Sequence, residues 1–201
     1  MAVFIGKAES FPISLIMDLA SRDLEKVLIN DPELFKEVSD YVTSEEKSFA
    51  NAISVEFDGG DIFAKFGVRE QIDLALKKEF QMSSGAQLVF EQTEALVSVD
   101  VNSGRKSIDI DPKVGGTDAQ EQLAIQVNME AAELIPSQLR LRNLAGLIVI
   151  DFINMSTTEG RDQVLAALKK GLQTDPATTR LDGFSDHGVV QMTRRRAGKS
   201  L

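Results

Sequence analysis

The chain has 201 residues and carries 22 Lys and Arg against 31 Asp and Glu, a formal net charge of -9. This length suits one domain, or two small lobes that share a core. Cysteine is absent, which excludes disulfides, thiolate zinc sites and cysteine nucleophiles. The acidic balance argues against non-specific binding to nucleic acid, but it leaves open a nuclease that meets phosphate through a divalent cation.

No apolar run reaches the roughly 18–20 residues that cross a bilayer. The opening residues, MAVFIGKAES, lack the basic start and the long apolar core of a signal peptide. We therefore expect a cytoplasmic protein without a membrane partner.

The first 80 residues alternate between strand and helix patterns. Ile72, Leu76 and Phe80 are spaced four apart, which predicts a helix over 68–80. Ser83–Gly85 is the clearest turn, and we expect a boundary between two lobes beside it. The expected strands are 2–5, 24–30 and 52–57, and the expected helices before residue 68 are 10–21 and 31–42.

The rest of the chain predicts a mixed sheet with helices packed on it, an α/β (α+β) fold. Residues 86–102 read as two strands joined by a tight turn at 92–94. A long helix follows over 117–143, in which Pro136 predicts a kink or a break. The nearly continuous apolar run at 144–153 predicts a central strand covered on both faces. A helix at 158–173 and a strand at 188–195, which ends in a basic tail, complete the pattern.

Two of the predicted strands end in an acid. In VSVDVNSGR, at 97–105, the valines alternate with Asp100 and Asn102, which therefore lie on the opposite face of the strand. The apolar strand LIVID ends in Asp151. If the strands are neighbours, the two carboxylates repel unless one is protonated or a cation lies between them. Mg²⁺ binds one or two carboxylates and keeps several waters, so the alternatives are a metal site and two solvated strand ends.

Three segments resemble the catalytic core of the ribonuclease E/G family. They are EQTEALVSVDVNSGR (91–105), NMEAAELIPSQLRLRNLAGLIVIDFINM (128–155) and GFSDHGVVQMTRRR (183–196). The resemblance implies a Mg²⁺-dependent endoribonuclease that cleaves single-stranded RNA to 5′-phosphate and 3′-hydroxyl ends. It also implies an RNase H-like subdomain over 1–82, incomplete at its start, followed by a DNase I-like catalytic subdomain over 83–201.

The same resemblance assigns the candidate site. It implies that Asp100 and Asp151 bind Mg²⁺, for which Mn²⁺ can substitute, and that Asn102 orients the site through hydrogen bonds. Asn154 stands where the family motif usually has a second Asp. The family's S1 domain, 5′-phosphate sensor and zinc-binding motif have no counterpart in these 201 residues, so we expect no zinc, weak RNA affinity and slow, poorly selective turnover.

Four basic residues are candidate RNA contacts. Arg105 and Lys106 directly follow the acidic strand end, where a metal-bound phosphate would lie. Arg140 and Arg142 lie at the end of the long predicted helix. There they either complement the negative helix terminus or hold phosphate bidentately.

Three functions remain open at this point. The first is a minimal Mg²⁺-dependent endoribonuclease acting on single-stranded RNA. The second is a catalytically weak or inactive RNA-binding or assembly module, which the net charge favours. The third is a nuclease that acts on DNA. We also expect a homo-oligomer, a dimer, because an incomplete RNase H-like part leaves sheet edges that need cover.

Overall fold

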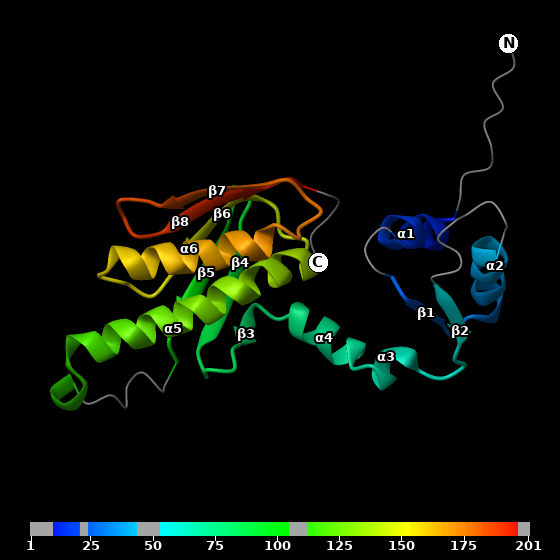
Figure 1. Ribbon diagram of the computed structural model, residues 1–201, viewed down its shortest axis with the longest axis horizontal. Coiled ribbons are helices and arrows are strands. Elements are labelled where there is room, and N and C mark those ends of the chain that lie inside the picture. The colour runs from blue at the N-terminus through cyan, green and yellow to red at the C-terminus, as the bar shows by residue number, and fades with distance from the viewer. Residues whose placement is uncertain (1–9, 21–23, 44–52, 105–111, 197–201) are drawn as a thin grey trace, which may run out of the picture. The chain divides into compact units, whose positions relative to one another are not determined.

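The computed structural model describes residues 10–20, 24–43, 53–104 and 112–196, shown in Figure 1. The predicted strand at 2–5 and the candidates Arg105 and Lys106 lie outside these residues. The chain divides into two compact units, 1–70 and 71–201, which we describe separately. The predicted RNase H-like and DNase I-like identities of residues 1–82 and 83–201 stay predictions.

The first unit joins a two-stranded parallel sheet to helices. The pairing of its two strands begins with Lys26 opposite Ser54. Asp31 begins α2 by accepting the N–H of Leu34 on its Oδ1 at 2.7 Å, as its position before Pro32 predicts. The prediction of two strands and two helices here is confirmed, and a short third helix was missed. The elements are α1 (Phe11–Ala20), β1 (Lys26–Ile29), α2 (Pro32–Thr43), β2 (Ser54–Phe57) and α3 (Ile62–Lys65).

The predicted helix over 68–80 is only partly correct. Helix α4 spans Val68–Ala75, and the chain then forms strand β3, Glu79–Gln81. Phe80 pairs opposite Leu88 of the next strand and packs against the hydrophobic core of the second unit. Pairing with that strand therefore outweighs the local helical spacing of apolar residues, because this spacing carries no information about a partner strand.

The second unit is built on a six-stranded mixed sheet in the order β3-β4-β5-β6-β8-β7. Strands β5 and β6 are parallel, and the other described pairings are antiparallel. The predicted mixed α/β fold is confirmed, although strand β7 was not expected. The remaining strands are β4 (Gln87–Gln92), β5 (Leu96–Asn102), β6 (Gly146–Asp151), β7 (Thr179–Phe184) and β8 (Val190–Arg194).

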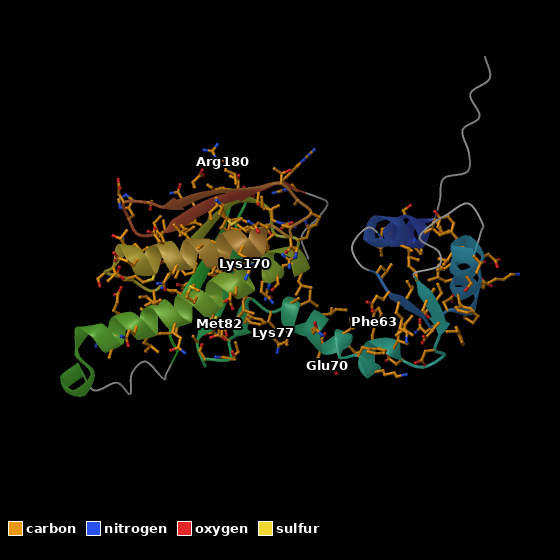
Figure 2. All side chains as sticks on the ribbon, viewed as in Figure 1. Phe63, Glu70, Lys77, Met82, Lys170 and Arg180 are labelled. Atoms are coloured by element: carbon orange, nitrogen blue, oxygen red, sulfur yellow. The ribbon has the colours of Figure 1, made fainter. Side chains whose placement is uncertain are left out.

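Two helices pack on one face of this sheet, α5 (Pro112–Leu141) and α6 (Thr158–Leu172). Val97, Val99 and Val101 of β5 are buried in the same core as the apolar residues of both helices. Figure 2 shows side chains filling the space between helices and sheet. On β6, however, Leu147 is 43% exposed. The prediction that the run at 144–153 is covered on both faces is therefore wrong, since Leu147 lies on an open face.

Helix α5 continues through Pro136, so of the two predicted alternatives, a kink or a break, the break is wrong. The proline ring packs against Gly171 of α6, where a Cβ would lie 2.7 Å from the ring Cγ. The absence of a side chain at Gly171 therefore lets the helices approach closely at the point where the proline disturbs α5. Neither α5 nor any other described helix is long and apolar enough to cross a membrane.

Candidate metal site at the paired strand ends

Asp100 and Asp151 lie side by side at the ends of two neighbouring strands. Strands β5 and β6 are parallel, and these two residues are opposite each other in the register. Adjacent strands are about 4.8 Å apart. Each acid is exposed and follows a buried residue, Val99 or Ile150, so both carboxylates project from the open face. The predicted juxtaposition of these strand ends is confirmed.

Asn102 lies on the same face as Asp100 and contacts it directly. Its side-chain Nδ2 donates a hydrogen bond of 2.7 Å to Oδ2 of Asp100. This bond restrains one carboxylate oxygen and leaves Oδ1 for another ligand. The geometry fits an orienting role for Asn102, which stays a prediction.

The two acids offer a suitable but minimal set of ligands for a hard cation. In the described part of the chain, neither carboxylate forms an ion pair with Lys or Arg. The described residues also contain no group of three or more His, Cys, Asp or Glu that could hold a metal ion together. A divalent ion here would therefore have two protein carboxylates and keep most of its positions for water or substrate oxygens, as Mg²⁺ commonly does.

The segment after Asp151 is held by side chains that sequence reasoning missed. Asn128 of α5 donates from Nδ2 to the carbonyl of Ile153 at 2.7 Å and accepts the Ile153 N–H at 3.0 Å. Arg161 of α6 donates to the carbonyl of Met155 at 3.0 and 2.8 Å. One signal was available: Asn128 interrupts an apolar stripe of α5 that also contains Ala124, Ala131, Ala132 and Ile135.

Glu121 of α5 fixes the end of the same segment, where α6 begins. Its carboxylate accepts the backbone N–H and the hydroxyl of both Ser156 and Thr157, at 2.7–3.0 Å. Thr157 is in turn the N-cap of α6. These hydrogen bonds, first those from the two backbone N–H groups, lower the pKa of Glu121 from 4.5 to about 2.

Because the folded pKa of Glu121 lies below the unfolded value, the stability that its ionised form contributes is present above about pH 4.5 and is lost as the pH falls toward 2. Glu121→Gln should therefore flatten the acid side of the stability profile. Urea unfolding at a series of pH values measures this effect. Glu133→Gln, about three turns further along α5, is the control. An identical acid slope in the parent and in Glu121→Gln would contradict the assignment.

Gly104, just after the end of β5, packs closely against the turn between β3 and β4. Its φ is +69°, and a Cβ there would overlap the carbonyl oxygen of Gly85. Gly104→Ala should lower the free energy of unfolding by about 2–4 kcal/mol, through left-handed strain and overpacking together. Gly188→Ala is the matched control, because φ is +82° there and nothing lies within 4 Å of the added carbon. Denaturant unfolding that gave equal losses would show that the close approach contributes nothing.

The candidate RNA contacts differ in position. Arg142 is only 6% exposed, and its guanidinium donates to the carbonyl of Lys77 and, at 3.5 Å, to that of Leu74. It also lies 4.5 Å from the ring centre of Phe90, and burial lowers its pKa. These contacts, made near the end of α4, favour a structural role for Arg142 over phosphate binding.

Arg140 lies in the last turn of α5, where it complements the negative end of the helix. Its Nη1 is enclosed and has no hydrogen-bond partner among the described residues. Its charge also helps to lower the pKa of Asp175. An RNA-binding role for Arg140 stays a prediction, as it does for Arg105 and Lys106.

Sequence comparisons relate nearly the whole chain to known proteins. The model of the Ribonuclease E/G family matches residues 2–197. Ribonuclease G of Haemophilus influenzae is 34% identical over 192 residues, which are 96% of this chain and 38% of the relative. Ribonuclease G of Escherichia coli K12 is 31% identical over 187 residues, 93% of this chain and 37% of the relative. A chloroplastic ribonuclease E/G-like protein of Arabidopsis thaliana is 32% identical over 98% of this chain and 19% of its own length.

Fold and site define a mixed α/β domain with two acids paired on parallel strands. The chain belongs to the ribonuclease E/G family. It spans less than two fifths of the length of these curated relatives.

Proposed function

We propose that this chain is the catalytic core of an endoribonuclease that hydrolyses single-stranded RNA with Mg²⁺, leaving 5′-phosphate and 3′-hydroxyl ends. The observation that carries the proposal is the register of β5 and β6, which sets Asp100 beside Asp151 on an exposed face. Kinship with proteins named as ribonucleases supports RNA as the substrate.

Each residue of the site has a defined task in this proposal. Asp100 and Asp151 hold Mg²⁺, or Mn²⁺ in its place, through their carboxylate oxygens. Asn102 keeps the Asp100 carboxylate in one orientation through its 2.7 Å hydrogen bond. When bound, the cation polarises the phosphoryl group and makes a water molecule more acidic. Exposure of both acids lets a phosphodiester reach them without any rearrangement of the sheet.

Two further parts of the proposal concern the larger architecture. Residues 1–82 and 83–201 are proposed as the RNase H-like and DNase I-like parts. The parallel pair β1–β2 lies in the first, and five of the six strands of the larger sheet, β4 to β8, lie in the second. A homodimer is proposed because uncovered sheet edges favour association.

The second candidate function is an inactive RNA-binding or assembly module. The net charge of -9 and the burial of Arg142 favour it, because both reduce the positive surface that would retain RNA during cleavage.

Cleavage of labelled single-stranded RNA separates these functions. We expect products with Mg²⁺ and none with EDTA, and little cleavage of a DNA oligonucleotide of the same sequence. RNA binding without Mg²⁺-dependent products would favour the inactive module. Equal cleavage of RNA and DNA would instead indicate a nuclease that does not select the sugar.

A further inference from the structure

We infer that Asn128 is a positioning residue for Asp151, and this inference rests on the proposed function. Asn128 lies on α5, is 0% exposed and uses both polar atoms of its side chain on one residue. Nδ2 donates to the carbonyl of Ile153 at 2.7 Å, and Oδ1 accepts the N–H of Ile153 at 3.0 Å.

These bonds begin where the sheet stops supporting β6. The ladder between β6 and β8 ends at Ile150, and the ladder between β5 and β6 ends at Asp151 itself. Asp151 is therefore the last paired residue of its strand. Two residues later, the amide of Asn128 supplies one donor and one acceptor to the backbone, as a neighbouring strand would. Asp151 therefore lies between Ile150, where the β6–β8 ladder ends, and Ile153, which Asn128 holds.

The side chain of Asn128 suits this task chemically. A carboxamide carries a donor and an acceptor in one plane, whereas a carboxylate only accepts and an aliphatic chain does neither. The segment that it holds is also fixed by Phe152, whose ring is buried and lies 6.0 Å from the ring of Phe184. Arg161 and Glu121 act further along, from Met155 onward, so Asn128 is the nearest of the three to Asp151.

Two carboxylates can bind one cation tightly only if their separation is maintained within about 0.5 Å. Without the bonds from Asn128, the end of β6 would be free to move and Asp151 would sample positions away from Asp100. We therefore expect Asn128→Ala to weaken divalent-cation binding by about tenfold, the lower end of the effect of groups that orient metal ligands. Some binding should remain, because both carboxylates are still present.

The test measures Mn²⁺ binding to the full chain without RNA, from the electron paramagnetic resonance signal of the free ion. The variants are Asn128→Ala and Asn128→Ser, of which the second retains a small polar group in case the first does not fold. Gln138→Ala is the matched control. Gln138 is a second buried carboxamide on α5, 6% exposed, about three turns beyond Asn128, where it accepts a hydrogen bond from Nε of Arg142 at 3.3 Å. Denaturant unfolding measures the loss of stability of each variant.

The expected result is weaker Mn²⁺ binding in the Asn128 variants and parent-like binding in Gln138→Ala, at equal folded fractions. Parent-like binding in the Asn128 variants would overturn the positioning role alone and leave the proposed function intact. An equal weakening in Gln138→Ala would also overturn it, by tracing the effect to general destabilisation. If the parent itself binds no Mn²⁺, the proposed function fails, and the positioning role falls with it.

Discussion

Asp151→Asn is expected to slow Mg²⁺-dependent cleavage of single-stranded RNA by about a hundredfold or more, without lowering the free energy of unfolding. In the proposed function Asp151 is a metal ligand, and the loss of such a ligand removes several kcal/mol of charge stabilisation in the transition state. Each 1.36 kcal/mol is about tenfold in rate. Stability should stay unchanged or rise by up to about 1 kcal/mol, because like charges on neighbouring strands destabilise a sheet. Initial cleavage rates and urea unfolding of the same preparation measure the two effects.

Asp100→Asn should behave in the same way, since the two acids share one register position. Asp182→Asn is the matched control. It removes an exposed acid from edge strand β7 of the same sheet, where Asp182 pairs with Arg180, and it should leave the cleavage rate unaltered. An Asp100 or Asp151 variant that cleaved as fast as the parent would remove the basis of the proposed function.

Asp175→Ala is expected to lower the free energy of unfolding by about 3–5 kcal/mol, because it leaves a buried guanidinium without its partner. Arg194 donates to both carboxylate oxygens of Asp175, at 2.8 and 3.0 Å. The side chains are 4% and 0% exposed. Arg194 also donates to the carbonyl of Leu144 at 3.0 Å, so the pair joins the end of β8 to the segments before β6 and β7. Denaturant unfolding measures the loss.

Two comparisons make this prediction specific. The side chains of Arg180 and Asp182 on β7 form an ion pair and are 80% and 42% exposed; Arg180 is labelled in Figure 2. Replacing Asp182 by Ala should therefore lower the free energy of unfolding by less than about 1 kcal/mol. The double change Asp175→Leu with Arg194→Met should recover much of the loss, because it removes both buried charges together. A loss at Asp175 as small as that at Asp182 would contradict the prediction.

The buried pair also has a pH dependence. Burial raises the pKa of Asp175, but the hydrogen bonds from Arg194 and from the N–H of Ala177 outweigh it and hold the pKa below its usual range. The stabilising effect of ionised Asp175 is therefore complete above the unfolded pKa of about 3.9 and is lost as the pH falls through the folded value.

The alternation of residues in a strand explains why the candidate site was predictable. Buried Val99 and Val101 flank exposed Asp100 as the sequence pattern requires, and the apolar run before Asp151 marks β6 as a central strand. Pairing of the two strands depends on sheet order, which local sequence does not encode. The predicted adjacency was therefore conditional until the register was known.

The parts that were missed depend on tertiary contacts. Arg194 belongs to a run of three arginines that reads as a basic tail, yet it is buried because Asp175 lies within reach. Arg142 reads equally well as a phosphate ligand or as a helix cap until Phe90 and the carbonyl of Lys77 are placed around it. The helical spacing that ends at Phe80 likewise gives no sign of the partner strand that draws this residue into the sheet.

The parallel pairing of β5 with β6 has a consequence for the order of folding. Antiparallel neighbours can form from short hairpins, whereas these two strands meet only after the whole α5 crossover has docked. Pairings between strands that are far apart in the sequence form slowly. A chain that has completed only its hairpins would carry Asp100 without Asp151 beside it, so the proposed divalent-cation site, and with it the proposed nuclease activity, should appear no earlier than the pairing of β5 with β6.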